Sequence, residues 1–219
     1  MEFVDCFPIW KDLTPAQRQT LSAAVTSRTV PSGTVIHREG LNCTGLLLVQ
    51  SGQLRAYILS DEGREITIYR LIERDVCLFS ASCIMHSIQF DVSIEAEKDT
   101  QVWVIPPDVY QALMEESAAA ANYVNTLMSG RFSEVVWLME QVLWKRMDQR
   151  LADFLLQESA LEGAASLSIT HEKIANHLGS AREVVTRMLR YFQSEGLVAL
   201  SRGRVELTDR KGLSDLAGT

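Results

Sequence analysis

One stretch, residues 180–190, limits the fold of this chain more than any other, because as a helix it would have two chemically different faces. At about 100° per residue, one arc carries cationic, acidic and hydroxyl side chains: Arg182, Glu183, Thr186, Arg187 and Arg190. The opposite arc carries only apolar side chains: Val184, Val185, Met188 and Leu189. One face can therefore be buried while the other presents hydrogen-bonding groups to a partner.

A second short helix is predicted just before this stretch, over residues 170–179. Thr170 is a suitable N-cap for it, and Gly179 is suited to a left-handed C-cap. Two helices joined by a tight glycine turn form a helix-turn-helix, whose second helix enters the major groove of DNA. An ordinary surface helix with solvated charges is the alternative. Turn, spacing and side-chain chemistry together favour the DNA-binding motif.

The formal net charge of −7 is unevenly distributed along the chain. Residues 168–219 carry 8 Lys and Arg against 6 Asp and Glu, whereas residues 1–167 carry 13 against 22. The acidic remainder should oppose non-specific DNA contact, so binding would depend on a few well-placed cations. No apolar run could span a membrane and the N-terminus lacks the pattern of a signal peptide. We therefore expect a cytoplasmic protein, without membrane association and with reduced cysteines.

Residues 30–105 show a pattern of short strands separated by turn residues. Strands are predicted over residues 46–49, 54–59, 66–71 and 102–105. Many short strands at this spacing are typical of a barrel or jelly roll. Residues 1–29 should be a small helical segment, in which Thr14 and Pro15 begin a helix.

A long helix should follow the strands, because apolar residues from Ala121 to Val142 advance by alternating steps of three and four. The candidate dimer seam on this stripe consists of Met128, Phe132, Val135, Met139 and Val142. The stripe could instead pack only on the chain's own barrel. We favour a homodimer, because one small domain could not cover so long a helix. A further helix is predicted from Asp148, and residues 197–207 should form a hairpin wing.

In this order of elements the chain resembles, over essentially its full length, the family of the cyclic-AMP receptor protein and the fumarate-nitrate regulator (Crp/Fnr). The likeness includes the β-roll glycines Gly33, Gly45 and Gly52, and residues 150–156 resemble the first helix of the family's DNA-binding domain. The resemblance implies an α+β fold with an N-terminal double-stranded β-helix (a jelly roll of the cyclic-nucleotide-binding type) over residues 1–115. A dimerisation helix over residues 116–146 and a winged helix-turn-helix over residues 147–219 would follow. It also implies a bacterial homodimeric transcription regulator with a sensor in the β-roll, and RNA polymerase as a partner.

The triplet Arg182, Glu183 and Arg187 matches the base-reading residues of the receptor protein. An arginine fork fits guanine O6 and N7, and a glutamate can accept from cytosine N4. The resemblance implies palindromic double-stranded DNA with TGTGA-like half-sites, whereas the fumarate-nitrate branch reads TTGAT-like sites. Phosphate contacts are expected from hydroxyl and cationic side chains: Thr170, Ser180, Thr186, Arg190, Arg202 and Arg204.

The family's cyclic-nucleotide cassette falls on residues 78–93 of this chain. The candidate effector pocket there comprises Ser80, Ser82, Phe90 and Asp91. Phe90 occupies the position of the phosphate-binding arginine, Asp91 that of the adjacent serine, and Ser80 that of the ribose-binding glutamate. An aromatic ring and a carboxylate cannot neutralise a buried phosphate, so we expect no binding of cyclic AMP. An unidentified apolar metabolite is an alternative effector.

The redox and ligand candidates are Cys43, Cys77, Cys83 and His86. The chain's cysteines, with Cys6 as the fourth, lack the tight N-terminal cluster of the iron–sulfur branch, and we interpret them as small buried hydrophobes. A cluster, or a redox pair of Cys77 and Cys83, is the alternative. Residues 83–86 resemble the haem-binding Cys-Met-His stretch of the family's carbon-monoxide sensor. The spacing is one residue longer and the N-terminal proline ligand is missing, so we favour a histidine without a metal.

Other function classes find little support in the sequence. It has no phosphate loop, nucleophile elbow, zinc-protease motif or dinucleotide fingerprint, so we do not expect an enzyme. A protein-interaction module with a vestigial helix-turn-helix is the remaining alternative, but the intact triplet argues against it. The sequence does not reveal the effector, the cofactor, the regulated promoters, or whether the protein activates or represses.

Overall fold

The computed structural model describes residues 2–38, 43–84 and 92–218, without the side chains of residues 82–84. The chain divides into two compact units. The first comprises Met1–Ile58 and Ile68–Val135, and the second comprises Leu59–Thr67 and Val136–Thr219. Each unit has its own hydrophobic core, so each is described separately.

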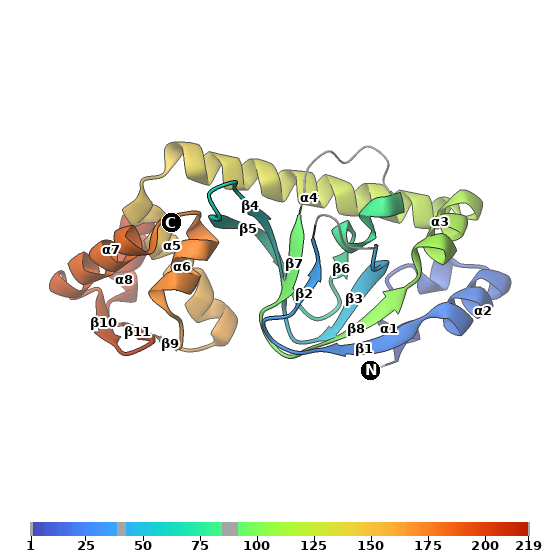
Figure 1. The fold of residues 1–219 in the computed structure, drawn as a ribbon, viewed down its shortest axis with the longest axis horizontal. Coiled ribbons are helices and arrows are strands. Elements are labelled where there is room, and N and C mark those ends of the chain that lie inside the picture. The colour runs from blue at the N-terminus through green and yellow to red at the C-terminus, as the bar shows by residue number, and fades with distance from the viewer. Residues whose placement is uncertain (1, 39–42, 85–91, 219) are drawn as a thin grey trace. The chain divides into compact units, whose positions relative to one another are not determined.

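The first unit is a jelly roll of two four-stranded sheets (Figure 1). One sheet has the order β1 (Thr26–Val30), β8 (Thr100–Ile105), β3 (Leu46–Ser51) and β6 (Val76–Cys77). The other has the order β2 (Val35–His37), β7 (Ser93–Ala96), β4 (Leu54–Leu59) and β5 (Glu65–Leu71). Residues of both sheets share one core. The expected jelly roll is therefore confirmed.

Strand β3 shows why its sequence is a continuous apolar run rather than an alternating one. Successive side chains of a strand point to opposite faces. Leu47 and Val49 contribute to the core between the sheets, while Leu46 and Leu48 contribute to a second core with the helices. Because both faces are covered, all four positions are apolar.

Helices cover the outer face of the first sheet. They are α1 (Phe3–Cys6), a 3₁₀ turn (Trp10–Asp12), α2 (Pro15–Ala24) and α3 (Pro107–Glu116). Thr14 caps α2 as expected, and with Gln17 it forms a capping box. A further 3₁₀ segment, Phe79–Ile84, follows β6. At the turn after β3, Gly52 has φ 91°, and a Cβ there would lie 2.5 Å from the carbonyl oxygen of Asp99, so only glycine fits.

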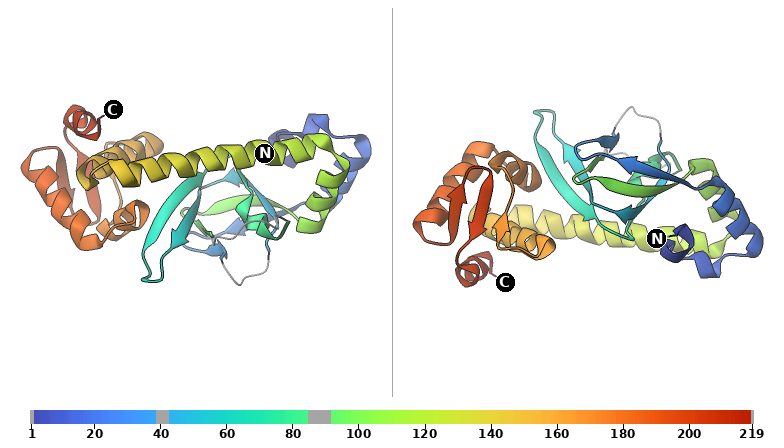
Figure 2. Two further views of the ribbon diagram at one scale, coloured as in Figure 1. Left: turned by 90° about the horizontal axis from the view of Figure 1, so that it is seen from above. Right: turned by 90° about the horizontal axis from the view of Figure 1, so that it is seen from below.

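Helix α4 (Ala118–Trp144) is one continuous helix of 27 residues (Figure 2). Ala120 is its one buried residue among those that the structure describes. Met128, one of the proposed seam residues, packs against the cores of the jelly roll. Val135 is partly exposed. The seam residues Phe132, Met139 and Val142 are exposed, with Phe132 at 70%. Most of the predicted stripe is thus available to a partner.

The second unit has the arrangement of a winged helix-turn-helix. Its helices are α5 (Met147–Glu162), α6 (His171–Leu178), α7 (Arg182–Ser194) and α8 (Arg210–Ala217). Its three-stranded sheet has the order β10 (Val198–Ser201), β11 (Arg204–Leu207) and β9 (Ser166–Leu167). Helix α5 begins one residue before the expected Asp148, with Arg146 as its N-cap. The predicted helix-turn-helix and wing are confirmed.

The turn between α6 and α7 packs closely against residues 59–67, which belong to the same unit. Ile66 forms an antiparallel bridge with Leu178. Gly179 ends α6 with φ 65°, and a Cβ on it would lie 3.0 Å from the Ile66 side chain. Gly179 is therefore required by its left-handed backbone and also by this close approach.

The cysteines correct two expectations from the sequence. Cys43 forms a disulfide bond, so the cysteines are not all reduced in this structure. Cys77 is a free, fully buried thiol, so it forms no disulfide bond with Cys83 in this structure. Burial raises the pKa of the Cys77 thiol, which makes it unreactive. Cys6 is also free and buried, as a small hydrophobe would be.

A search of the described helices for one long and apolar enough to span a membrane finds none. Within the same residues, His, Cys, Asp and Glu side chains form no group of three or more that could hold a metal ion.

Candidate nucleic-acid interface

Helix α7 has the two faces that its sequence predicts. Val185, Leu189 and Phe192 are completely buried in the core of the second unit. The opposite face carries four exposed side chains: Arg182, Glu183, Arg187 and Arg190. The apolar face fixes the helix on its unit, so the polar face is presented to solvent on a rigid support.

Contacts from α5 hold the helix-turn-helix in place. Nη2 of Arg150 donates a hydrogen bond of 2.6 Å to the carbonyl oxygen of Leu178, one of the free carbonyls at the end of α6. Phe154 stacks on His177 with ring centroids 5.2 Å apart. His177 is in turn hydrogen-bonded to Thr67, with 2.7 Å between Nδ1 and Oγ1. The end of α6 is thus held from both sides.

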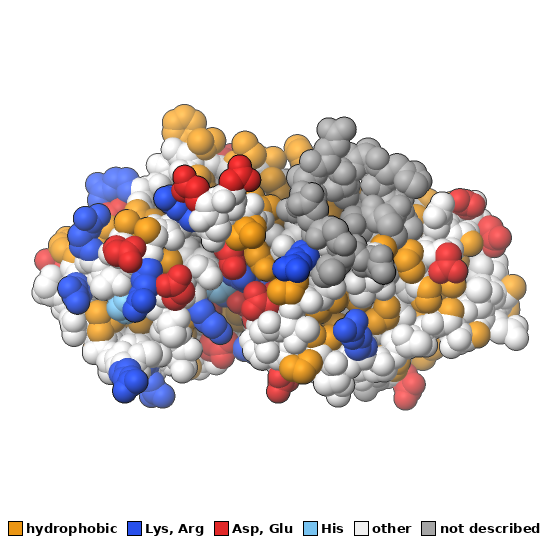
Figure 3. All heavy atoms as spheres, in the orientation of Figure 1, with side chains coloured by type: hydrophobic (Ala, Val, Ile, Leu, Met, Phe, Trp, Pro, Cys, Tyr) orange, Lys and Arg blue, Asp and Glu red, His pale blue; other side chains and the backbone are white. Residues whose placement is uncertain are grey.

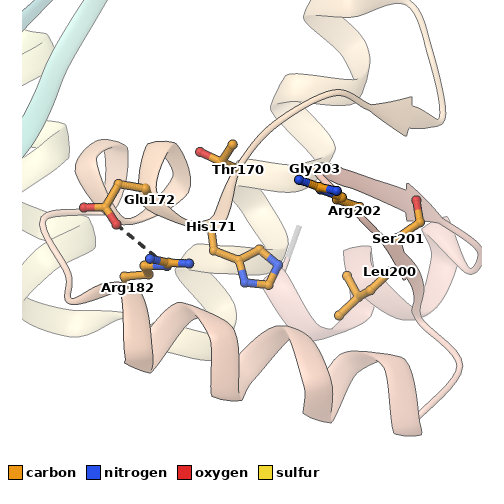
Figure 4. Close-up of a pocket in the computed structure, with 8 residues that line it drawn as sticks. All are labelled: Thr170, His171, Glu172, Arg182, Leu200, Ser201, Arg202 and Gly203. Carbon is orange, nitrogen blue, oxygen red and sulfur yellow. Dashed lines mark ion pairs between the residues drawn. The ribbon is translucent and has the colours of Figure 1, made fainter.

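A pocket of about 570 Å³ opens between the start of α6, the start of α7 and the wing. Figure 4 shows the side chains around it: Thr170, His171, Glu172, Arg182, Leu200, Ser201, Arg202 and Gly203. Two cations, Arg182 from α7 and Arg202 from the wing, face this space from different elements. Arg182 also forms an ion pair of 3.8 Å with Glu172, in which both side chains are more than half exposed. Such an exposed pair is weak and can open for a ligand.

His171 connects this pocket to the exposed face of α7. It is the first residue of α6, after the N-cap Thr170, whose hydroxyl accepts from the backbone N–H of Lys173. Nδ1 of its ring lies 2.9 Å from Oγ1 of Thr186. Partial burial and the neighbouring guanidiniums of Arg182 and Arg190 lower the pKa of His171 below its usual value. The imidazole is therefore neutral at physiological pH in the absence of a ligand.

The wing supplies two more cations. Ser201 pairs with Arg204 across the hairpin, with Arg202 and Gly203 at the turn. Gly203 has φ 70°, which a glycine adopts without strain. Arg202 and Arg204 are both exposed. On the face shown in Figure 3, Lys and Arg side chains gather over the end of the molecule formed by α6, α7 and the wing.

The structure brings together some of the predicted DNA-contacting residues in the pocket: Thr170, Arg182 and Arg202. Glu183, Arg187 and Arg190 lie on the exposed face of α7, and Ser180 and Thr186 are partly exposed. The sequence reasoning missed His171 and Glu172. The position of His171 next to the N-cap of α6 could have indicated it, because a helix N-terminus is suited to phosphate. Glu172 is an anion and lines the pocket as the ion-pair partner of Arg182.

Among the candidate sensor residues, the structure describes the side chains of Ser80, Cys43 and Cys77. Ser80 is completely buried, and its hydroxyl donates a 2.8 Å hydrogen bond to the carbonyl oxygen of Cys77. Its own carbonyl lies 3.7 Å from Sγ of Cys43. His86, Phe90 and Asp91 lie outside the described residues, as do the side chains of Ser82 and Cys83. The hydroxyl of Ser80 is therefore used in a hydrogen bond to the nearby backbone in this structure.

Comparison with known proteins agrees with this architecture. Residues 27–117 match the family of cyclic nucleotide-binding domains, and residues 149–216 match the Crp-like helix-turn-helix domain. The transcriptional activator protein Anr of Pseudomonas protegens is 30% identical over 199 residues, which are 87% of this chain and 80% of that protein. The cyclic AMP receptor protein of Thermus thermophilus is 25% identical over 210 residues, 96% of each chain.

A solved structure is more similar still. It is described as a candidate transcriptional regulator of the Crp/Fnr family from Eubacterium rectale. It is 59% identical, covers 98% of this chain and 100% of its own, and superposes with a TM-score of 0.96. Two adjacent domain matches, a relative matched over most of its length and a near-identical fold lead to the same assignment. The chain belongs to the Crp/Fnr family of DNA-binding transcription regulators, a family of regulators rather than of enzymes.

Proposed function

We propose that the protein is a homodimeric, sequence-specific transcription regulator whose α7 reads a palindromic DNA site from the major groove. The observation that carries this proposal is the division of α7 into two faces. Val185, Leu189 and Phe192 are completely buried, while Arg182, Glu183 and Arg187 are exposed on the side away from the core.

Base readout would come from the exposed triplet. A guanidinium donates two parallel hydrogen bonds to guanine O6 and N7, and a carboxylate accepts from cytosine N4. Arg182 and Arg187 would therefore select guanine and Glu183 cytosine, which fits TGTGA-like half-sites. Arginine at the first position distinguishes this site from a TTGAT-like one.

Phosphate contacts would surround the triplet. Arg202 and Arg204 on the wing, Arg190 on α7 and the hydroxyls of Thr170 and Ser180 are the candidate residues. The hydroxyl of Thr186, which the sequence also suggested for a phosphate, is hydrogen-bonded to His171 instead. These contacts set the register of the protein on DNA without reading its sequence. The slope of log K against log[salt] scales with the number of phosphates that the protein neutralises, so the small number of cations predicts a shallow salt dependence of binding.

The dimer seam would be α4. Its exposed apolar residues Phe132, Met139 and Val142 follow the spacing of a coiled coil. A twofold axis along this helix would place two α7 helices in successive major grooves, with half-site centres about 34 Å apart. Val135→Glu would introduce facing carboxylates in an apolar seam and should dissociate the dimer, as measured by sedimentation equilibrium. An unchanged dimer would exclude α4 as the seam.

The signal is proposed to act on the jelly roll and to differ from cyclic AMP. By the resemblance of residues 78–93 to the family's cassette, Phe90 and Asp91 replace the arginine and serine that bind the phosphate, and neither supplies a cation. As a regulator of bacterial genes the protein would act in the cytoplasm, with RNA polymerase as its partner at the promoter.

The function is tested by selecting binding sites from random double-stranded DNA with the purified protein. Wild type should enrich an inverted repeat. Arg182→Ala should reduce the binding free energy for that repeat by on the order of 1–3 kcal/mol. It should also relax the base preference at one position in each half-site. Arg202→Ala should weaken all sequences alike. Arg28→Ala, an exposed change on β1 in the first unit, is the matched control and should alter neither affinity nor sequence preference. An unchanged motif for Arg182→Ala would contradict the proposed readout.

A further inference from the structure

The hydrogen bond between His171 and Thr186 joins two parts of the interface that have different partners. The imidazole lies in the pocket with Arg182 and Arg202, where a phosphodiester would bind (Figure 4). The Thr186 hydroxyl lies on α7, one helical turn after Arg182 and beside Arg187, on the arc that faces a groove. Nδ1 and Oγ1 are 2.9 Å apart, so the two groups share one hydrogen.

The direction of this hydrogen bond depends on the tautomer and the protonation of the imidazole, because a neutral ring with its hydrogen on Nδ1 donates to Oγ1 and one with its hydrogen on Nε2 accepts from it. In a neutral ring that donates through Nε2, Nδ1 has a lone pair and accepts the hydroxyl hydrogen of Thr186. The hydroxyl oxygen then has only lone pairs left for other partners. In the protonated ring Nδ1 carries a hydrogen and donates to Oγ1, which leaves the hydroxyl hydrogen free to donate elsewhere.

We propose that the neutral His171 ring carries its hydrogen on Nε2 and that His171 is a positioning residue for base readout: its protonation state then determines whether the Thr186 hydroxyl presents an acceptor or a donor to a base edge. This inference rests on the proposed function, because it needs α7 to lie in a major groove. It goes further by making the sequence preference at one base position depend on a proton.

The chemistry of the groove defines the two preferences. An acceptor hydroxyl favours the amino groups of adenine or cytosine. A donor hydroxyl favours O6 or N7 of guanine, or O4 of thymine. One position of the half-site should therefore change from an amino-bearing base to a carbonyl-bearing base when His171 becomes protonated.

The charges around the ring make DNA itself a cause of protonation. Arg182 and Arg190 on α7 and Arg202 on the wing are positive, and Glu172 on α6 is the acidic neighbour, already paired with Arg182. Partial burial, together with the guanidiniums of Arg182 and Arg190, lowers the pKa of His171 in the free protein. A phosphodiester in the pocket would bring negative charge and raise that pKa again. DNA binding should then take up a proton, and affinity should increase as the pH falls.

The test is site selection at about pH 8 and about pH 5.5, on either side of the usual imidazole pKa. In wild type, the ratio of amino-bearing to carbonyl-bearing bases selected at one position should change on the order of fivefold between the two pH values. A change of this size is the effect of one hydrogen bond. Thr186→Ser keeps the hydroxyl and should keep the change. His171→Gln cannot titrate and Thr186→Val has no hydroxyl, so both should select one motif at both pH values.

A direct measurement accompanies the selection. The pKa of the His171 imidazole, followed by NMR, should rise when the selected duplex is added. A wild-type motif that is identical at both pH values, or a His171→Gln variant that changes as wild type does, would overturn the role of His171 and leave the regulator function intact. Failure to select any site at either pH would contradict the proposed function itself. Circular dichroism of each variant shows that a lost preference does not come from unfolding.

Discussion

The two units use their charged residues in opposite ways. In the jelly roll, Arg55 on β4 and Glu95 on β7 are directly opposite each other across neighbouring strands and form an ion pair of 3.0 Å, with the Arg55 side chain only 7% exposed. On α7 the arginines are exposed. Arg182 has a long and solvated ion pair with Glu172, and in the part of the chain that the structure describes Arg187 and Arg190 form none.

The difference follows from the cost of removing charge from water. A buried ion is stable only with a partner that offsets its desolvation, so Arg55 is bound to Glu95 and lies over the ring of Tyr57 at 4.2 Å. A solvated ion needs no partner within the protein, because it keeps most of its hydration free energy while it stays exposed. The buried Arg55 of the jelly roll therefore stabilises the fold, and the exposed arginines of α7 are available to a polyanion.

The strongest test of this comparison is Arg55→Ala. It leaves the Glu95 carboxylate without its cation in a partly buried site and should reduce the free energy of unfolding by roughly 2–3 kcal/mol. Urea denaturation measures this change. Arg28→Ala, which removes an exposed arginine from β1, should change stability by less than about 0.5 kcal/mol. Equal stabilities of the two variants would show that burial does not distinguish these arginines.

Arg187→Ala should reduce DNA affinity rather than stability. Since Arg187 is exposed and contacts no acidic group in the described structure, its loss should leave the urea midpoint nearly unchanged. Affinity for the selected DNA should fall by about 1–3 kcal/mol, as measured by fluorescence anisotropy. A destabilised Arg187→Ala with unchanged DNA affinity would remove the functional contrast between the two units.

The smallest expected effect is on the pH dependence of stability. The folded-state pKa of His171 is lowered below the usual 6.5, so on acidification the unfolded chain takes up this proton first. The unfolded state then binds more protons, and stability should decrease slightly as the pH falls from about 7.5 to about 5.5. His171→Gln should reduce that slope in urea denaturation. A steeper slope for the variant would mean that folding favours the protonated ring.

Local patterns in the sequence were sufficient for the helix-turn-helix. Thr170 and Gly179 are the N-cap and the left-handed C-cap of α6. Of the predicted apolar arc of α7, Val185 and Leu189 are completely buried and Val184 and Met188 are partly buried. Thr14 and Pro15 begin α2 in the same way. These signals lie within a few residues of the structure that they determine, so no distant contact is needed to recognise them.

Other elements could not be recognised from local patterns. Strand β1 is polar and exposed at its first four positions, and its strand geometry comes from pairing with β8, 70 and more residues later. Strand β7 is likewise defined by β2 and β4 on either side. Helix α8, which the sequence reasoning did not predict, buries only Leu213 and Ala217 in the core of the second unit. Pairing and packing, rather than propensity, decide such segments.

The sequence by itself determined the winged helix-turn-helix, the jelly-roll class, the long helix and the exposed polar face of α7 with Arg182, Glu183 and Arg187, because periodicity, capping residues and side-chain chemistry are all encoded locally. Only the tertiary structure decided that Arg55 pairs with Glu95, that Cys43 rather than Cys77 is disulfide-bonded, and that His171 meets Thr186. Each of these relations joins residues that are distant in the chain, and the geometry that brings them together exists only after the sheets and helices have packed.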